Sequence, residues 1–176
     1  MALGIDYARQ DCSLARALEV VGERWTLLIL RDAFLGVRRF SDFAAHLDIS
    51  RAVLTQRLST LVDAGLLTRT SSGGHAVYEV TDDAVALWPA LFALAQWGEQ
   101  HSSPGRPRRL FAHAGCGGAV GGAGVCAHCG ATPLPQDLVT RPGPGTASPP
   151  LRDDPVARAL RTPHRLLQPL PTGRGG

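Results

Sequence analysis

Hydrophobic residues recur at helical spacing through most of the first hundred positions of this chain. Between Ser50 and Gly65, a step of 100° per residue gathers Leu54, Leu58 and Leu61 on one side. Ser50 is a favourable N-cap residue, and Gly65 supplies the left-handed residue at which many helices end. The pattern predicts one amphipathic helix that starts after Ser50 and ends just before Gly65.

The opposite face of this helix carries small hydroxyls, an amide and guanidinium groups, with no carboxylate before Asp63. Such side chains suit the base edges and phosphates of DNA. A solvated surface helix has a similar polar face, so the helix alone leaves both interpretations open. The polar face comprises Ala52, Thr55, Gln56, Ser59 and Thr60, with Arg51 and Arg57 on its flanks.

The elements on either side of this helix favour the DNA-binding interpretation. A short helix is predicted over residues 40–47, and residues 48–49 turn the chain into the longer helix, which is the order of a helix-turn-helix. Downstream, residues 66–70 and 77–81 alternate and are rich in β-formers, and the Ser-Ser-Gly-Gly run between them is typical of a turn. A hairpin directly after the second helix is a wing. The predicted fold class is mainly α with a small β-hairpin wing, a winged helix-turn-helix.

Apolar helices are predicted on both sides of this unit. A short amphipathic helix precedes Gly22, and the stretch from Trp25 to Phe34 is apolar on nearly all sides. Thr81 and the two acids after it mark a further helix start, whose apolar residues from Leu87 to Trp97 cover more than one face. Such a wide stripe can pack within its own domain, but it exceeds what a small winged core can cover. We therefore expect a homodimer that reads two half-sites of a pseudo-palindrome.

A second candidate site lies beyond these helices and resembles a pair of metal-binding knuckles. His113 and Cys116 are separated by two residues and followed by glycine, and so are Cys126 and Cys129. A two-residue spacer lets both side chains reach one tetrahedral ion, and the glycine permits the tight turn that follows. The segment contains few large apolar residues, so a metal would be its main source of order. The spacing predicts one structural zinc per chain on these four residues.

Other interpretations of the same residues stay open at this point. A disulfide between Cys126 and Cys129 lacks the βαβ pattern of a thioredoxin-like motif, and a reducing compartment disfavours it. Free cysteines on an unstructured arm are also possible. His128 is an alternative fourth ligand to His113, although its place inside a knuckle is geometrically awkward. A catalytic zinc would need a general base nearby, and no glutamate follows Glu99.

Charge is distributed unevenly along the chain. All 18 basic residues are arginine, and the formal net charge is +3. Residues 1–101 hold 9 Arg and 12 acids, whereas residues 102–176 hold 9 Arg and 3 Asp. Net charge therefore gives no support to DNA binding by the first part of the chain. The predicted DNA-binding unit is more favourable, because residues 38–69 contain five Arg and three Asp.

The sequence predicts no association with a membrane. No apolar run approaches the roughly 20 residues needed to span a bilayer, and the longest candidate, from Ala84 to Trp97, is interrupted by Pro89. No secretion signal follows the first methionine. We expect a cytoplasmic protein, in which thiols stay reduced.

These patterns divide the chain into three parts. Residues 1–102 form the winged helix-turn-helix and dimerisation domain, and residues 103–140 form the zinc-knuckle-like extension. Residues 141–176 contain eight prolines and few large apolar residues, which predicts a disordered tail rich in Pro, Gly and Arg. A short basic helix between Arg152 and Arg165 is the alternative for this last part.

Several blocks in the first hundred residues resemble, in order, the HxlR family of bacterial winged-helix regulators. The resemblance implies a homodimeric transcription factor that binds an operator, usually as a repressor and sometimes as an activator. The blocks are Cys12 to Arg31, Arg38-Arg39-Phe40-Ser41, Leu54 to Leu58, Ala64-Gly65-Leu66, Tyr78 to Thr81 and Trp97-Gly98.

The predicted function is that of a dimeric regulator of transcription. We expect a repressor that an unidentified effector, a small molecule or an oxidant, releases from double-stranded DNA. The alternative is a winged-helix module that docks a partner protein through its zinc knuckles. An enzyme is not expected, because the sequence shows no nucleophile–base pairing and no cofactor-binding loop. The residues predicted to contact DNA are Arg39, Ser50, Arg51, Thr55, Gln56, Arg57, Ser59 and Arg69.

Cys12 stands apart from the other three cysteines, at the start of the first amphipathic helix. A helix N-terminus and the nearby Arg9 and Arg16 favour the reactive thiolate form. The simpler interpretation is a small hydrophobic residue buried in a dimer interface. Some members of the HxlR family use a cysteine at this position to sense oxidants or electrophiles, so the resemblance implies Cys12 as a possible redox sensor.

Overall fold

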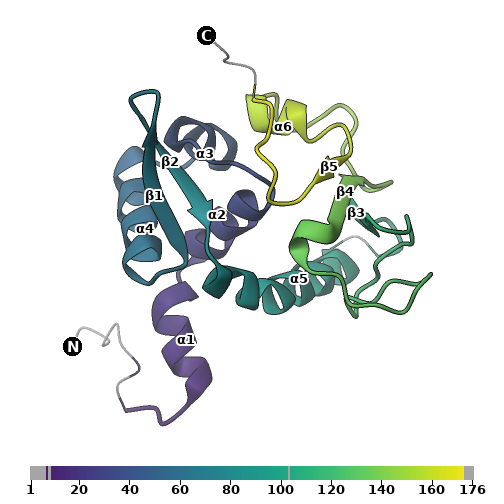
Figure 1. The fold of residues 1–176 in the computed structure, drawn as a ribbon, viewed down its shortest axis with the longest axis horizontal. Helices are drawn as coiled ribbons and strands as arrows, with labels where there is room; N and C mark the ends of the chain where they lie inside the picture. Colours follow the sequence, from purple (N-terminus) through teal and green to yellow (C-terminus); the bar gives the residue numbers. More distant parts are fainter. Residues whose placement is uncertain (1–6, 8, 103, 173–176) are drawn as a thin grey trace.

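The computed structural model describes residues 7, 9–102 and 104–172, and its elements follow the predicted order up to the hairpin (Figure 1). A second sheet, of three strands, and a short helix come after the long helix α5. The elements are α1 (Ser13–Val21), α2 (Arg24–Phe34), α3 (Phe40–Leu47), α4 (Arg51–Asp63), β1 (Leu67–Ser72), β2 (His75–Val80), α5 (Asp82–Ser102), β3 (Arg109–His113), the 3-10 turn η1 (Pro135–Asp137), β4 (Leu138–Pro142), α6 (Pro155–Ala159) and β5 (His164–Arg165).

The helix-turn-helix is formed by α3 and α4, and its end residues are those that the sequence indicates. The Ser50 hydroxyl accepts a hydrogen bond from the Val53 backbone N–H at the start of α4. Asp48 ends α3 in the left-handed region with φ 53°, and Gly65 follows α4 with φ 72°. Leu54, together with Leu58 and Leu61, is fully buried. The predicted amphipathic helix is confirmed.

The wing is an antiparallel hairpin of β1 and β2, in register from Leu67 opposite Val80 to Ser72 opposite His75. The two glycines at its tip have φ 58° and 78°, as a two-residue turn with two positive φ angles requires. The Tyr78 backbone N–H donates to the Arg38 carbonyl, which ties the hairpin to the segment before α3. The wing is therefore fixed at its base, while its tip is exposed.

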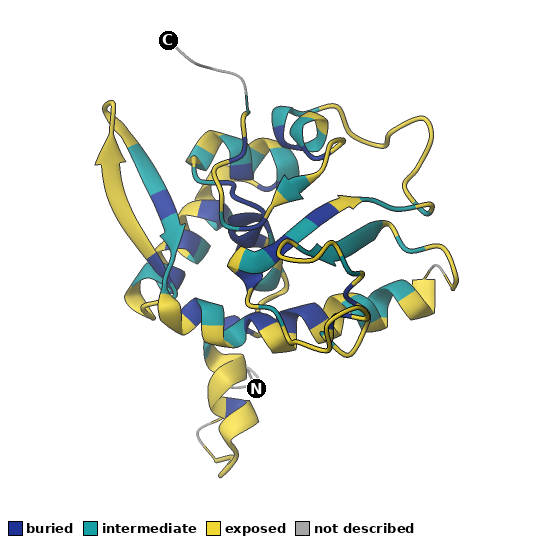
Figure 2. Ribbon diagram, turned by 45° about the vertical axis from the view of Figure 1, so that its right-hand side comes forward, coloured by how far each residue is buried: buried dark blue, intermediate teal, exposed yellow. Residues whose placement is uncertain are grey.

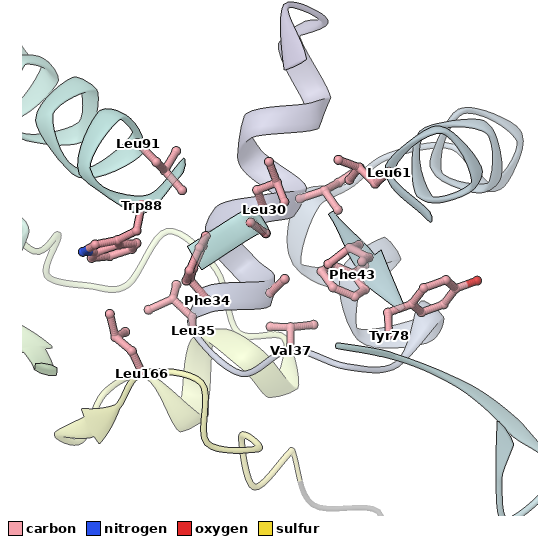
Figure 3. Close-up of a cluster of buried hydrophobic side chains, with 14 of the residues drawn as sticks. Leu30, Phe34, Leu35, Val37, Phe43, Leu61, Tyr78, Trp88, Leu91 and Leu166 are labelled. Carbon is pink, nitrogen blue, oxygen red and sulfur yellow. The ribbon is translucent and has the colours of Figure 1, made fainter. Parts of the chain in front are cut away.

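The hydrophobic core is centred on α2. Phe34 is fully buried, and its ring centroid lies 4.9 Å from that of Trp88 on α5. On the other side of α2, Phe43 packs edge-on against Tyr78 of the wing. Figure 3 shows these side chains meeting around α2, with Leu166 from the far end of the chain beside Trp88. One core thus joins the winged unit to the C-terminal residues.

The C-terminal sheet, in the order β3-β4-β5, packs against α5. Phe111 on β3 lies 5.1 Å from Phe92 and 6.3 Å from Trp88, between ring centroids. Val120 and Leu138 are buried and belong to the same core as the winged unit. The sequence suggested that a metal is the main source of order in residues 103–140. The structure adds a second source, because Phe111 packs on the aromatic rings of α5.

The structure differs from the predicted disordered tail, because residues 141–142 belong to β4 and residues 154–172 contain buried side chains, although residues 146–153 between them are exposed. Val156 and Leu166 are 0% and 1% exposed, and Leu160 and Leu170 are also buried. The backbone N–H groups of Leu167 and Leu170 donate to the carbonyls of Phe34 and Gly36. The composition misleads because a few apolar residues, spread among prolines, bury themselves on the winged unit instead of on one another. Residues 173–176 lie outside the described part of the chain.

The basic-helix alternative for this tail is also not what the structure shows, since α6 has only five residues. Its neighbouring arginines are paired within the chain: Arg161 lies 2.6 Å from Asp153, and Arg165 lies 3.0 Å from Asp137. No helix in the described residues is long and apolar enough to cross a membrane.

Candidate nucleic-acid interface and metal centre

The residues predicted to contact DNA lie on α4 and on the two segments beside it. All are exposed except Arg57, which is half-buried, and Figure 2 shows one strand of the hairpin, β1, mainly in the colour of exposed residues. The exposed ones are Arg39 before α3, Ser50 at the N-cap of α4, Arg51, Thr55, Gln56 and Ser59 on α4, and Arg69 on β1.

Local contacts hold several of these side chains in place. The Arg51 guanidinium lies 5.0 Å from the centroid of the Phe40 ring, which anchors its stem against α3. The Thr55 hydroxyl donates to the Arg51 carbonyl at 2.8 Å, so its lone pairs stay available to accept. The Ser50 hydroxyl is already used as the helix cap. Ser50 therefore positions the start of α4, whether or not its side chain also contacts DNA.

This face is positive although residues 1–101 as a whole are not. Arg38 is neutralised by Glu79 of the wing at 2.6 Å. Among the residues that the structure describes, no carboxylate lies within ion-pair distance of Arg39, Arg51 or Arg69. The helix-turn-helix and the wing therefore carry three guanidinium groups without a carboxylate partner, one of them, Arg51, on α4 itself. The local charge, not the net charge, suits a polyanion.

The four predicted metal ligands converge at one point. Their ligand atoms all lie within 4.8 Å of one another. The Cys116 sulfur lies 3.5 Å from the His113 Nδ1, 3.5 Å from the Cys126 sulfur and 3.7 Å from the Cys129 sulfur. A tetrahedral zinc with Zn–S bonds of about 2.3 Å places neighbouring sulfurs roughly 3.8 Å apart. The cluster therefore has the dimensions of a four-coordinate metal site and can hold a metal ion.

Two matching turns build this cluster. The Gly117 N–H donates to the His113 carbonyl at 2.8 Å, and the Gly130 N–H donates to the Cys126 carbonyl at 2.9 Å. Both glycines have φ 71°, a conformation that side chains disfavour. Gly118 is equally constrained by space, because a Cβ there would lie 2.6 Å from the Cys126 sulfur. The glycines that the sequence places after each knuckle are thus geometric requirements.

The electrostatics of the cluster favour a thiolate. Hydrogen bonds from the backbone N–H groups of Cys129 and His128 lower the pKa of Cys126 to about 6. Because the thiolate is the form that binds metals, the Cys126 sulfur is suited to bind a metal ion. The cysteines are not joined in a disulfide, and the His128 ring is not part of the cluster. His113, not His128, completes the ligand set.

Cys12 is exposed at the N-cap of α1, away from the cluster. Its exposure in the single chain is compatible with burial in a dimer interface, and that interpretation stays a prediction. Its role as a redox sensor stays a prediction.

A network of charged groups connects α2, α3 and the residue before α6, and it was not predicted from the sequence. Asp32, on the largely apolar α2, is fully buried, and burial raises its pKa. Its carboxylate accepts from Arg31 at 2.7 Å and lies 3.8 Å from His46 on α3. His46 in turn lies 3.1 Å from Asp154 before α6. An aspartate within an apolar helix was the available signal, and its partners come from segments more than 100 residues apart.

Comparison with known proteins places this arrangement in a family. Residues 20–106 match the model of HxlR-like helix-turn-helix proteins. The uncharacterized HTH-type transcriptional regulator Rv3095 of Mycobacterium tuberculosis H37Rv is 42% identical over 137 residues, which cover 76% of this chain and 87% of that protein. The chain belongs to the HxlR-like helix-turn-helix family. It is accordingly a transcription regulator of the DNA-binding helix-turn-helix type.

The likeness to the mycobacterial relative extends past the family's own region. The aligned 76% amounts to about 134 of the 176 residues, so wherever the alignment begins it includes all four cluster positions. The HTH-type transcriptional regulator YdeP of Bacillus subtilis is 27% identical and matches 56% of this HxlR-like chain and 83% of its own. Among solved structures, the putative transcription factor PA1607 is 41% identical over 53% of this chain and 67% of its own, with a TM-score of 0.50.

Proposed function

We propose that this protein binds operator DNA as a homodimer, with α4 in the major groove and the wing beside the neighbouring backbone. The observation that carries the proposal is the exposed surface of α4, which presents Thr55, Gln56 and Ser59 together with Arg51, a guanidinium that no carboxylate of the described residues neutralises. Hydroxyl and amide groups suit base edges, and flanking guanidinium groups suit phosphates. The family's helix-turn-helix supports the same role.

A second copy of the chain is the proposed dimer partner. Leu14 and Leu18 on α1, Leu28 on α2, and Leu94 and Trp97 on α5 are large apolar residues that remain exposed. Helix α1 projects from the body of the molecule, and only two of its residues are buried (Figure 1). Large apolar patches with no cover mark interaction surfaces. A two-fold dimer through these helices would place two copies of α4 on a pseudo-palindromic operator.

Zinc is the proposed occupant of the Cys/His cluster, in a structural role. Three thiolates and one imidazole in tetrahedral array are the ligands of closed zinc sites, which leave no position open for catalysis. Regulation completes the proposal: the protein acts as a repressor that an effector releases from DNA. An oxidant acting on Cys12 is one candidate for that signal.

Loss of single polar side chains of α4 should weaken specific binding. We expect Gln56→Ala and Arg57→Ala each to cost about 1–3 kcal/mol of operator binding, measured by gel shift on the DNA upstream of the protein's own gene. Arg141→Ala, an exposed arginine of the C-terminal sheet, is the matched control and should bind normally. Binding that is absent in the wild type, or that does not weaken with salt, would refute the assignment and favour the partner-docking alternative.

Charge introduced on the exposed apolar face should separate the protomers. We expect the Leu94→Glu, Trp97→Glu double variant to sediment as a monomer, because two buried like charges would face each other across a two-fold axis. Leu134→Glu is the control, since Leu134 is 55% exposed but lies outside these three helices. Analytical ultracentrifugation gives the answer. A wild-type monomer at micromolar concentration, or a double variant that remains dimeric, would contradict this interface.

A further inference from the structure

A cavity of about 740 Å³ lies between α2, α5 and the C-terminal segment. Its walls are mainly apolar, and the volume falls within the roughly 300–1,000 Å³ of small-molecule sites. None of the DNA-contacting or metal-binding candidates lines it, whereas two residues of the proposed dimer face, Leu28 and Leu94, do. Among its apolar lining residues are Leu27 and Leu28 of α2, Trp88, Leu91 and Phe92 of α5, and Phe111 of β3.

One wall of this cavity carries a cation with an incomplete set of partners. The Arg109 Nε donates to the Thr140 hydroxyl at 3.1 Å, and Nη1 donates to the Leu160 carbonyl at 2.9 Å. Its Nη2 is buried and has no hydrogen-bond partner in the described part of the chain. No carboxylate of those residues lies within ion-pair distance of Arg109 either. A half-buried guanidinium in this state lacks the compensation that buried charges normally receive.

The surroundings of Arg109 add to its positive charge instead of offsetting it. Arg31 of α2 lines the same cavity, and Asp32, its carboxylate partner, is buried behind it. Burial and the charge of Arg31 lower the pKa of Arg109 to about 10, so the side chain stays cationic at neutral pH. By contrast, Arg108, Arg152 and Arg161, which also line the cavity, each have a carboxylate partner, and Glu99, the one carboxylate in the lining, is the partner of Arg108. The cavity therefore combines an apolar wall with a guanidinium, that of Arg109, which no carboxylate of the described residues neutralises.

We propose that this cavity is the effector site, and that its ligand is a small organic carboxylate with an apolar, aromatic or long aliphatic body. The carboxylate would accept from Arg109 and Arg31, because a planar guanidinium matches two carboxylate oxygens. The body would lie against Trp88, Phe92 and Phe111. The assignment deepens the proposed regulatory function, on which its effector role rests.

The cavity is connected to the DNA-binding unit by the charged network behind α3. Arg31 holds Asp32, and Asp32 faces His46 of α3, which also lines the cavity. Arg152 donates to the Ala45 carbonyl at the same helix. An anion that draws Arg31 into the cavity would weaken its hold on Asp32 and alter the support of α3. The contact between Arg31 and Asp32 would then differ between the ligand-free and the ligand-bound protein. Coupling between two sites requires such a difference, and here it would act on α3, the first helix of the helix-turn-helix.

Strand β3 joins the two C-terminal features. Arg109, Phe111 and His113 occupy alternate positions of the strand and so lie on one face. Arg109 and Phe111 line the cavity, and His113 belongs to the Cys/His cluster. The proposed structural zinc would thereby fix the strand that presents the anion-binding arginine.

Calorimetric titration of the full-length protein with matched probes tests the site. The probes are naphthalene-2-carboxylate and naphthalene-2-carboxamide, together with benzoate and decanoate. We expect naphthalene-2-carboxylate to bind at least tenfold more tightly than its carboxamide. In Arg109→Gln that preference should disappear, whereas Arg141→Gln, an exposed arginine of the neighbouring strand, should retain it.

A second variant avoids the structural contacts of Arg109. Ala95 is exposed and lines the cavity from α5, so Ala95→Trp should fill the space without removing any hydrogen bond, and it should weaken both naphthalene probes at least tenfold. Equal binding of carboxylate and carboxamide, unchanged preference in Arg109→Gln, or no binding of any carboxylate probe would overturn the proposal. The last result is also what a second protein copy filling the cavity would produce.

Gel shift separates the effector role from DNA binding itself. With ligand absent, the wild type tests the proposed function alone. With naphthalene-2-carboxylate added, we expect at least a fivefold change in operator affinity that Arg109→Gln does not show. Unchanged affinity in the presence of a bound carboxylate would overturn the effector role, whereas failure of the ligand-free protein to bind DNA would count against the proposed function and not against the cavity.

Discussion

Protein purified under reducing conditions without chelator is expected to contain one zinc per chain, and the Cys126→Ser, Cys129→Ser double variant to contain none. The four ligand atoms lie within 4.8 Å of one another, and serine does not replace a thiolate for this ion. Apparent binding free energies of structural zinc are about 10–16 kcal/mol near neutral pH. Elemental analysis of both proteins measures the stoichiometry directly.

Loss of the metal should disorder the residues around the cluster and leave the winged unit folded. Hydrogen exchange is expected to lose protection between Ala114 and Thr132, because this stretch is held mainly by the two knuckles. Helices α2 to α4 should keep theirs, since their Leu and Phe core contains no metal ligand. His128→Ala and Cys12→Ser are the controls and should retain one zinc, as neither side chain belongs to the cluster. Substoichiometric zinc in the wild type, or full retention in the double variant, would refute the site.

The winged unit was predictable because its determinants are local. The cap at Ser50, the left-handed glycine at Gly65 and the leucine spacing between them each act within one or two turns. The wing depends on a short turn of two glycines. The knuckles were equally readable, since a ligand, two spacers, a ligand and a glycine are all within five residues. In these regions, chain neighbours supply most of the relevant contacts.

The C-terminal packing was not predictable from the same rules, because its partners are distant in the sequence. Leu166 and Leu170 carry no helical or strand periodicity and stand among prolines. What orders them is the surface around Phe34 and Gly36, more than 120 residues earlier. The cavity has the same origin: Arg109 is an ordinary basic residue in the sequence and becomes unusual only when Leu160 and Arg31 close around it.

Replacing Leu166 with alanine is expected to destabilise the protein by about 2–5 kcal/mol, as large-to-small substitutions in a packed core do. Leu166 is 1% exposed and lies among Trp88, Leu35 and Phe34 (Figure 3). Leu151→Ala is the matched control: it is the same substitution in the same Pro-rich segment, but Leu151 is 90% exposed. Its effect should stay within about 0.5 kcal/mol.

Urea denaturation of both variants, monitored by tryptophan fluorescence, gives the two free energies of unfolding. Truncation before Pro163 should exceed the effect of Leu166→Ala, because it also removes Leu170 and the two backbone hydrogen bonds to Phe34, at the end of α2, and to Gly36. If the tail were disordered, its removal would leave the midpoint of urea denaturation unchanged. Equal stabilities of wild type, Leu166→Ala and the truncated chain would therefore show that residues 163–172 do not pack on the winged unit in solution.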